Sequence, residues 1–175
     1  MKVFVTGGSG FVGREIIQQL ITENHSVRAL VRQADALDDF SDIETVVGDT
    51  TQPETLENQL SDCHAVIHLV GIIREFPGRG GTFQKLHLES TENMVHAAEE
   101  QGVKRYIQMS ANGTREKAVT SYHQTKWLAE EKVRQTNLDW TIFRPSLIYG
   151  PGDQFVNMLA QLIKNLPLVP VMGDG

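Results

Sequence analysis

The chain has 175 residues, a formal net charge of −6 and a hydrophobic content of 40%. This length allows one domain with a sizeable core and is too short for two. The negative charge argues against a nucleic-acid-binding protein, which would carry a basic face, but leaves room for local binding of an anionic small molecule. The single cysteine, Cys63, excludes an internal disulfide. Because the sequence also contains no long apolar run and no signal-type N-terminus, it predicts a cytoplasmic protein without a membrane span.

Short β-branched runs alternate with longer stretches of helical period, which is typical of βαβ units and a parallel sheet. Strands are expected at residues 2–6, 26–31, 44–47, 65–70, 104–109 and 138–143, and helices at 11–23, 53–60, 82–101, 120–135 and 154–164. Gly102 is well placed to cap the helix over 82–101. The expected fold is an α/β, Rossmann-type, doubly wound parallel sheet in three α/β/α layers, with residues 1–175 forming one domain.

A glycine-rich loop over residues 6–13 lies between the first expected strand and the first expected helix. Glycines there let the chain turn tightly, let a pyrophosphate approach the backbone and let the helix pack close to the sheet. The amides of residues 9–12 would then face the phosphates, with the positive end of the helix dipole behind them. A turn without a ligand is the alternative, but the position of the loop favours dinucleotide binding. The cofactor-binding residues expected here are Gly7, Ser9, Gly10, Phe11, Val12 and Gly13.

Arg32 follows the second strand, at the place where NAD-binding proteins usually carry Asp or Glu to hold the ribose 2′-hydroxyl. The next acidic residue along the chain is Asp35. Arg32, helped by Arg28, could instead bind a 2′-phosphate in a bidentate manner, whereas a solvated surface arginine is the alternative. The sequence therefore favours NADP(H) as cofactor, with NAD(H) as the second candidate.

The ends of the third and fourth strands add to this site. Asp49 follows the third strand, where a carboxylate can accept a hydrogen bond from an adenine amino group; its other interpretation is an N-cap for the short helix near Pro53. Residues 69–71 end the fourth strand beside the point where ligands bind in such sheets. The further cofactor-binding residues expected are Asp49, Thr50, Leu69, Val70 and Gly71.

A possible catalytic set follows in the second half of the chain. Ser110 comes directly after the fifth strand, so its hydroxyl should emerge at the carboxyl edge of the sheet. Tyr122 and Lys126 are four residues apart on the next helix and therefore share a face. A nearby ammonium is expected to lower the pKa of the tyrosine from about 10 towards the working range, while the serine holds a substrate carbonyl. Taken alone, the spacing of Tyr122 and Lys126 also fits an exposed pair of side chains on a helix.

Segments 6–13, 110–111 and 122–126 together resemble a short-chain dehydrogenase/reductase of the extended or atypical kind, a group that includes NAD-dependent epimerases and dehydratases. Segments 87–93 and 141–153 are most similar to the branch related to an accessory subunit of respiratory complex I. The resemblance implies hydride transfer served by Ser110, Tyr122 and Lys126. It also implies that Tyr122 and Lys126 contact the cofactor, with Lys126 holding the nicotinamide ribose, and that Pro145 and Ile148 lie by the carboxamide. His87 departs from the pattern, because many relatives carry Asn in this helix, which feeds a proton relay.

Six histidines raise the question of a metal site. His64 and His68 flank a strand, where a four-residue spacing does not converge as it would on a helix. Neither Cys63 nor a nearby acid completes a zinc set, so no metal is expected. Arg74 and Arg79 could meet an anionic substrate, or they are solvated charges on the loop over residues 71–81.

The sequence predicts an NAD(P)-binding oxidoreductase or epimerase-like enzyme that transfers hydride between NADP(H) and a small carbonyl, alcohol or nucleotide-sugar-like substrate. Two alternatives are a non-catalytic, cofactor-bound accessory or assembly subunit of a redox complex and a dinucleotide-sensing regulator. Relatives also suggest a homodimer formed through helices 82–101 and 120–135. We further expect a substrate-covering part after residue 175, beneath which the apolar face of helix 154–164 would be buried.

Overall fold

A computed structural model describes residues 1–153 and 155–165. Six strands form one sheet in the order β3-β2-β1-β4-β5-β6, and every neighbouring pair is parallel. The strands are β1 (Lys2–Thr6), β2 (Ser26–Val31), β3 (Ile43–Val47), β4 (Ala65–His68), β5 (Arg105–Met109) and β6 (Asp139–Phe143). Because the chain winds in opposite directions from β1, the carboxyl ends of β1 and β4 flank the position where ligands bind in such sheets.

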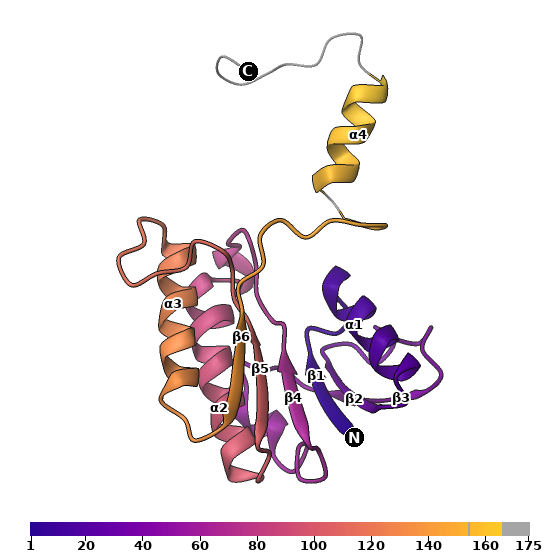
Figure 1. The fold of residues 1–175 in the computed structure, drawn as a ribbon, viewed down its shortest axis with the longest axis vertical. Coiled ribbons are helices and arrows are strands. Elements are labelled where there is room, and N and C mark those ends of the chain that lie inside the picture. The colour runs from indigo at the N-terminus through magenta and orange to yellow at the C-terminus, as the bar shows by residue number, and fades with distance from the viewer. Residues whose placement is uncertain (154, 166–175) are drawn as a thin grey trace.

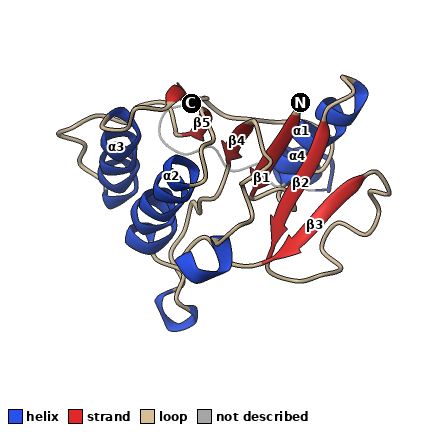
Figure 2. Ribbon diagram, turned by 90° about the horizontal axis from the view of Figure 1, so that it is seen from below, coloured by secondary structure: helices blue, strands red, loops and turns tan. Residues whose placement is uncertain are grey.

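Helices cover both faces of the sheet (Figure 1). Helix α1 (Phe11–Thr22) packs against β1 and β2 on one face, while α2 (Ser90–Glu100) and α3 (Ser121–Arg134) pack against each other on the opposite face. Figure 2, which looks at the molecule from below, separates these layers. The predicted Rossmann-type α/β/α architecture is confirmed. The remaining helical elements are η1 (Pro53–Leu56), η2 (Pro77–Arg79), η3 (Gln84–Glu89) and α4 (Phe155–Asn165).

Successive residues of the central strands contribute their side chains to two separate hydrophobic cores. In β1, Val3 and Val5 belong to a cluster with Ile17 of α1, whereas Phe4 belongs to a cluster with Met94 of α2. Side chains alternate across a strand, so a strand covered on both faces must be apolar at every position, as β1 is between Val3 and Val5. This double burial holds the carboxyl ends of the strands at a fixed edge, from which the functional loops project.

Three predicted elements differ in detail. Strand β4 ends at His68 rather than at residue 70, because the chain leaves the sheet after Leu69 donates its amide hydrogen to Thr6 O at 3.1 Å. The short helix that begins at Pro53 is a single 3₁₀ turn rather than a helix to residue 60, and Asn58 adopts a left-handed φ of 59° shortly after it. The helix predicted over 82–101 begins as the π-helix η3 and continues as α2. Gly102, with φ of 76°, confirms the predicted helix end.

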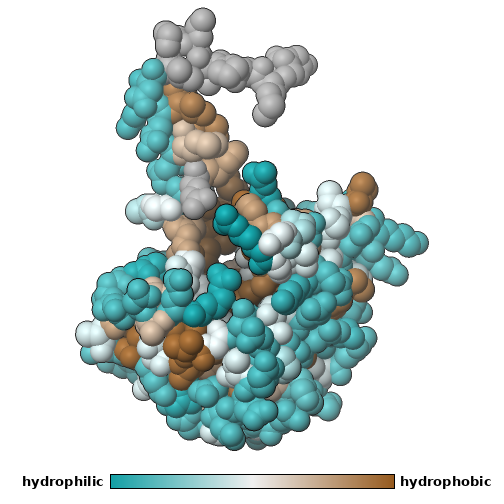
Figure 3. Space-filling model, turned by 180° about the vertical axis from the view of Figure 1, so that it is seen from behind, coloured by the Kyte–Doolittle hydropathy of each residue, from teal (hydrophilic) through white to brown (hydrophobic). Residues whose placement is uncertain are grey.

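Helix α4 confirms the helix predicted over 154–164, although residue 154 lies outside the described residues. Its large apolar side chains are exposed: Phe155, Met158, Leu159, Leu162 and Ile163. Figure 3 shows the brown, apolar side of this helix above the main body. Among the described residues, no helix is both long and apolar enough to span a membrane.

Candidate active site

The glycine-rich loop has the geometry that its sequence predicts. Gly7 turns the chain with φ of 73°, a conformation that disfavours other residues, and its carbonyl accepts from Gly10 N at 3.1 Å. A Cβ atom on Gly13 would lie 2.3 Å from Gly7 O, so the glycine allows α1 to approach the loop. A Cβ atom on Gly10 would meet only Gly7 O, at 3.3 Å, and otherwise faces open space. The first turn of α1 also has no side-chain cap, which fits a loop that binds an anion.

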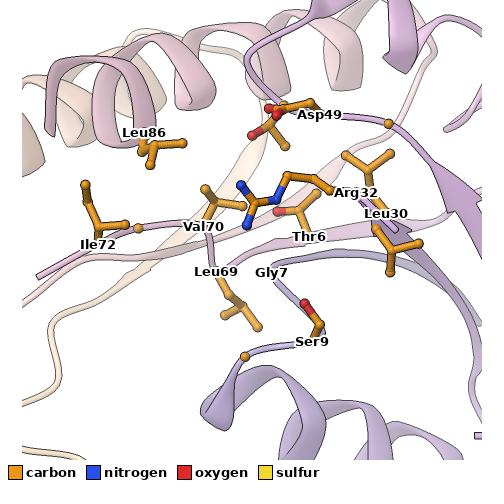
Figure 4. A pocket seen from close by; sticks show the side chains of 15 residues that line it. Thr6, Gly7, Ser9, Leu30, Arg32, Asp49, Leu69, Val70, Ile72 and Leu86 are labelled. Atoms are coloured by element: carbon orange, nitrogen blue, oxygen red, sulfur yellow. The ribbon is translucent and has the colours of Figure 1, made fainter. Parts of the chain in front are cut away.

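A cleft of about 260 Å³ lies over the loop and the ends of β1, β2 and β4 (Figure 4). We call it the dinucleotide cleft. Arg32 extends into it from the end of β2, as Figure 4 shows, and Asp49 lies on the opposite side of the guanidinium from Thr6. Most of the residues predicted to bind cofactor line this one cleft: Gly7, Ser9, Gly10, Arg32, Asp49, Thr50, Leu69, Val70 and Gly71.

Two expectations about the dinucleotide cleft are wrong. Arg28 does not assist Arg32, because its guanidinium forms ion pairs with Glu44 at 2.8 Å and Asp62 at 2.5 Å and does not line the cleft. Asp49 is not the N-cap of η1, since the residue in that position is Gln52. Asp49 Oδ1 instead accepts from the amide and the hydroxyl of Thr51, both at 2.8 Å, and thereby shapes the loop after β3.

A buried polar network supports the floor of the dinucleotide cleft. His68 Nδ1 lies 2.6 Å from Thr6 Oγ1, and His68 Nε2 lies 3.3 Å from Ser90 Oγ. Ser90 in turn donates to Thr50 Oγ1 at 2.7 Å. Burial, followed by the positive charge of Lys126 and the neighbouring His87, lowers the pKa of His68 to about 3, so the imidazole is neutral. The network therefore ties the phosphate loop to the loop after β3 without a charge.

A second, larger cleft of about 870 Å³ opens beside the first, and we call it the reaction cleft. It contains all of the remaining predicted site residues: Phe11, Val12, Gly13, Ser110, Tyr122, Lys126, Pro145 and Ile148. Its wall is shared with the dinucleotide cleft at Gly7, Gly10 and Leu69. The loop that would hold a pyrophosphate is thus continuous with the wall that carries the predicted catalytic side chains.

Lys126 and Tyr122 both lie in this wall, but their electrostatics differ from the sequence prediction. The Lys126 ammonium is buried and donates to Met109 O at 3.1 Å, and desolvation lowers its pKa to about 8, partly offset by Glu130. Tyr122 packs edge-on against the rings of Phe83 and His87. Burial raises the pKa of Tyr122 above its ordinary value of 10.0. The predicted lowering by Lys126 is therefore wrong for this arrangement, because desolvation of the phenol dominates.

Ser110 is at the predicted strand end but has a different partner from the one predicted. Its hydroxyl donates to Glu130 Oε1 at 2.5 Å and is buried. Burial alone would raise the pKa of Glu130, but hydrogen bonds from Arg144, Ser110 and Arg134 outweigh it and lower the pKa. A serine hydroxyl has one hydrogen to donate, so Ser110 in this arrangement cannot also donate to a substrate carbonyl.

Glu130 is a residue that the sequence analysis missed. It is fully buried and joins the ends of β5 and β6 to α3 through Ser110, Arg144 and Arg134. A signal was available, because Glu130 follows Lys126 by four residues, as Lys126 follows Tyr122, and all three share a helix face.

His87 anchors the chain where it leaves β4. Its Nε2 atom lies 3.2 Å from Ile72 N and 3.0 Å from Ile72 O, and its Nδ1 atom lies 3.0 Å from Thr125 Oγ1. Burial, with a contribution from the Lys126 charge, lowers the pKa of His87 to about 3. A neutral imidazole from η3 thus holds the segment that separates the two clefts.

The two histidines that raised the question of a metal site, His64 and His68, lie at opposite ends of β4. His64 accepts a hydrogen bond from Lys2 N at 3.1 Å at the opposite edge of the sheet from the clefts, far along β4 from the Thr6–His68 pair. Within the residues that the structure describes, no three His, Cys, Asp or Glu side chains are grouped so that they could hold a metal ion.

A glycine loop and a ligand cleft at the carboxyl edge of a doubly wound parallel sheet define a dinucleotide-binding domain of the Rossmann type. The chain belongs to the NAD(P)H-binding family, whose model matches residues 7–158. The resemblance to the short-chain dehydrogenase/reductase superfamily is thereby confirmed, as is a nicotinamide cofactor at the level of NAD(P).

Relatives of known name include reductases, dehydrogenases and a respiratory subunit. The chain is 31% identical to a ceramide reductase of Caulobacter vibrioides, over 98% of this chain and 54% of the relative. It is 31% identical to a 3-beta-hydroxysteroid dehydrogenase of Mycolicibacterium neoaurum, over 94% of this chain and 54% of the relative. It is 26% identical to the mitochondrial NADH dehydrogenase [ubiquinone] 1 alpha subcomplex subunit 9 of Arabidopsis thaliana, over 98% of this chain and 44% of the relative. The chain thus spans about half the length of the curated relatives it matches.

Solved structures share the fold. The oxidoreductase ylbE from Lactococcus lactis is 28% identical and superposes with a TM-score of 0.72 over 83% of this chain and 68% of that one. The Bordetella bronchiseptica enzyme WbmH, solved with NAD⁺, has a TM-score of 0.77 over 93% of this chain and 62% of that one, at 20% identity.

Proposed function

We propose that this chain forms the cofactor-binding part of an NADP(H)-dependent reductase or dehydrogenase in which Tyr122 exchanges a proton with the substrate oxygen. The observation that carries the proposal is the position of Tyr122 and Lys126 in one wall of the reaction cleft, which also contains the glycine loop over residues 10–13. Relatives named as ketoreductase, ceramide reductase and dehydrogenase are consistent with this type of reaction.

The donor set of the two clefts fits a nicotinamide dinucleotide. Open space at Gly10 and the uncapped start of α1 suit the pyrophosphate. Asp49 and Arg32 would hold the adenosine end, and Lys126 the nicotinamide ribose. Pro145 and Ile148 would lie by the carboxamide. When bound, the nicotinamide ring supplies or accepts a hydride.

The protonation states favour reduction at neutral pH. A raised pKa keeps the Tyr122 phenol protonated, so its O–H is available to the oxygen of a carbonyl that gains negative charge. Lys126, with a pKa of about 8, carries a positive charge at neutral pH within the same wall. Its charge favours the tyrosinate that remains after proton donation. Oxidation of an alcohol needs the tyrosinate at the start and is expected to require a higher pH.

We propose NADP(H) rather than NAD(H) as the preferred cofactor. Arg32 is exposed and extends into the dinucleotide cleft, and its guanidinium has no hydrogen-bond or ion-pair partner among the described residues. A guanidinium that reaches a 2′-phosphate can form two charge-assisted hydrogen bonds. The proposed homodimer through η3–α2 and α3, and the cytoplasmic location, stay predictions.

A non-catalytic, cofactor-bound subunit is the second candidate. The observation that favours it is the commitment of the Ser110 hydroxyl to Glu130, which takes one expected donor away from the substrate. The similarity to complex I subunit 9 of Arabidopsis thaliana points the same way.

Turnover by the Tyr122→Phe variant separates the two candidates. If Tyr122 is the proton donor, NADPH-dependent reduction of a carbonyl substrate found by screening should fall by about 10²-fold or more, while NADPH affinity stays unchanged. Tyr149→Phe is the matched control, because Tyr149 is 72% exposed and does not line the reaction cleft. Unchanged turnover in Tyr122→Phe, or tight NADPH binding with no turnover of any substrate, would replace the enzyme with the cofactor-bound subunit.

A further inference from the structure

We propose that the substrate of the reaction cleft is a ketone or secondary alcohol on a large apolar body, polycyclic or long-chain, and that it is not a nucleotide sugar. This inference rests on the proposed function, since it concerns the same cleft and the same Tyr122. It adds the chemical class of the substrate, which the reaction type does not determine.

The walls of the reaction cleft beyond Tyr122 are apolar. Ile73 and Phe76 come from the loop between β4 and η3, Leu147 follows β6, and Phe155 begins α4. Their exposed fractions are 89%, 52%, 58% and 52%, in that order. Three separate segments therefore bring large, solvent-exposed apolar side chains to one concave site. Contiguous exposed apolar surface of this kind is uncommon on proteins unless it binds something, and ligand pockets are predominantly apolar.

The reaction cleft offers few free positive charges to bind a diphosphate. Arg74, Lys126 and Asp153 are the charged residues among the described residues that line it. Lys126 is buried and donates to Met109 O at 3.1 Å, and Asp153 accepts from Val156 N at 2.6 Å to cap α4. Among the described residues, Arg74 is therefore the one charge at the surface of the cleft without a hydrogen-bond or ion-pair partner, and its guanidinium lies over the Phe76 ring, 5.8 Å from the centroid. This arrangement leaves room for a single anionic group. A nucleotide diphosphate would bring two phosphates and a polar base into an apolar site, where desolvation is costly.

The apolar wall is held in position by specific contacts. Phe76 and Gly81 exchange two backbone hydrogen bonds of 2.7 and 3.1 Å, which close the turn that carries η2. Glu75 accepts from Phe83 N at 2.7 Å, and His87 binds the backbone of Ile72. Ile73 thus follows directly on an anchored residue. The part of the wall that carries Ile73 and Phe76 therefore has a defined position before a ligand arrives, which limits the entropy that binding must overcome.

Size supports the same class of substrate. The reaction cleft measures about 870 Å³, more than three times the 260 Å³ of the dinucleotide cleft. Sites of 300–1,000 Å³ in proteins take ligands of drug-like size, on the order of a steroid or a fatty chain. A nicotinamide held by Lys126 and Pro145 would still leave the apolar part of the cleft near Ile73 and Leu147 with room for such a body.

Binding to the whole natural chain, saturated with NADP⁺, tests the substrate class without relying on turnover. Equilibrium dialysis would compare progesterone and 2-tridecanone, as apolar ketones, with UDP-glucose. We expect at least one ketone to bind about tenfold more tightly than UDP-glucose or better. Ile73→Ser should then weaken ketone binding by roughly tenfold, the effect of losing one large apolar contact, and should leave NADP⁺ affinity unchanged. Val119→Ser is the matched control, because Val119 is 88% exposed and lies outside the cleft.

Three outcomes would overturn the inference: UDP-glucose binding at least as tightly as the ketones, no binding of either ketone, or equal effects of Ile73→Ser and Val119→Ser. Absence of ketone binding, or equal effects of the two variants, would indicate that another part of the protein covers the apolar wall. In that case the melting temperature should fall in Ile73→Ser and stay unchanged in Val119→Ser. These failures are distinguishable from failure of the proposed function. The Tyr122→Phe variant tests proton transfer, whereas ketone binding in the presence of NADP⁺ does not require the phenol hydroxyl.

Discussion

The two clefts lie at the same edge of one sheet but are built by different means. The dinucleotide cleft lies over the ends of β1, β2 and β4 and includes glycines such as Gly7 and Gly10. The reaction cleft depends on side chains with specific partners, among them Ser110 with Glu130 and Lys126 with Met109 O. A site at strand ends and a glycine turn can be located from the order of strands and turns. A side-chain site depends on which of several neighbours each polar group meets, and residue spacing leaves that choice open.

The largest effect that would test this contrast is expected at Gly10. A valine there would fill the open space above the loop, so Gly10→Val should abolish NADPH binding while the protein still folds. Fluorescence titration with NADPH measures the loss, and circular dichroism checks the fold. Gly78→Val is the control, because a Cβ at Gly78 would meet nothing within 4 Å and the residue lines neither cleft. Wild-type affinity in Gly10→Val would mean that the loop is a turn only.

The next largest effect is expected at Arg32, one of the two charged residues that line the dinucleotide cleft. Arg32→Ala should weaken NADPH binding by about 1–3 kcal/mol, the contribution of charge-assisted hydrogen bonds, and should leave NADH binding almost unchanged. Isothermal titration of wild type and variant with both cofactors measures this difference. Arg79→Ala is a suitable control, since Arg79 lines neither cleft. Equal affinities of wild type for NADPH and NADH would remove the preference for NADP(H).

A smaller effect is expected from Ser110→Ala. Because the hydroxyl already donates to Glu130, we expect turnover to fall by less than about tenfold, well below the loss in Tyr122→Phe. The fully buried Glu130 would still keep Arg144 and Arg134 as partners, so the fold should survive. Steady-state kinetics of both variants provide the comparison. A loss in Ser110→Ala as large as that in Tyr122→Phe would show that the serine turns from Glu130 to the substrate.

The smallest effect concerns pH. With a pKa lowered to about 8, Lys126 is an ammonium below that pH and a neutral amine above it. Its attraction for the anionic cofactor should therefore be present at neutral pH and decline as the pH rises through about 8, raising the dissociation constant of NADPH a few-fold. Titrations on either side of this pH measure the change. Lys126→Met should bind more weakly and show no such dependence; an identical pH profile in the variant would assign the titration to another group.

The fold was predictable from sequence because its signals are local and repeated. Apolar β-branched runs, a glycine loop and helix caps such as Gly102 each act over a few residues. The same holds for Gly13, whose role in close packing follows from its place in the loop. Spacing places Glu130 on the helix face of Lys126, but it does not give the partners of Ser110 and Arg28, because Glu130 and Asp62 lie 20 and 34 residues away in sequence. The pKa of Tyr122 was missed for a related reason: spacing shows that Lys126 is near, but not that the phenol is desolvated by Phe83 and His87.

The neutral state of His68 fixes a direction for the hydrogen bonds beneath the dinucleotide cleft. A neutral imidazole has one N–H, so it can donate on one side only. Since Ser90 donates its hydrogen to Thr50, its oxygen is the acceptor for His68 Nε2–H, and Nδ1 accepts from Thr6. Every donor then points from β1 towards the loop after β3, and the tautomer of His68 is set. Thr50 is the last member of this series of hydrogen bonds: its hydroxyl oxygen accepts from Ser90 and its own hydrogen remains to be donated. The Thr50 hydroxyl is therefore a donor at the wall of the dinucleotide cleft, where a ribose or adenine acceptor would lie.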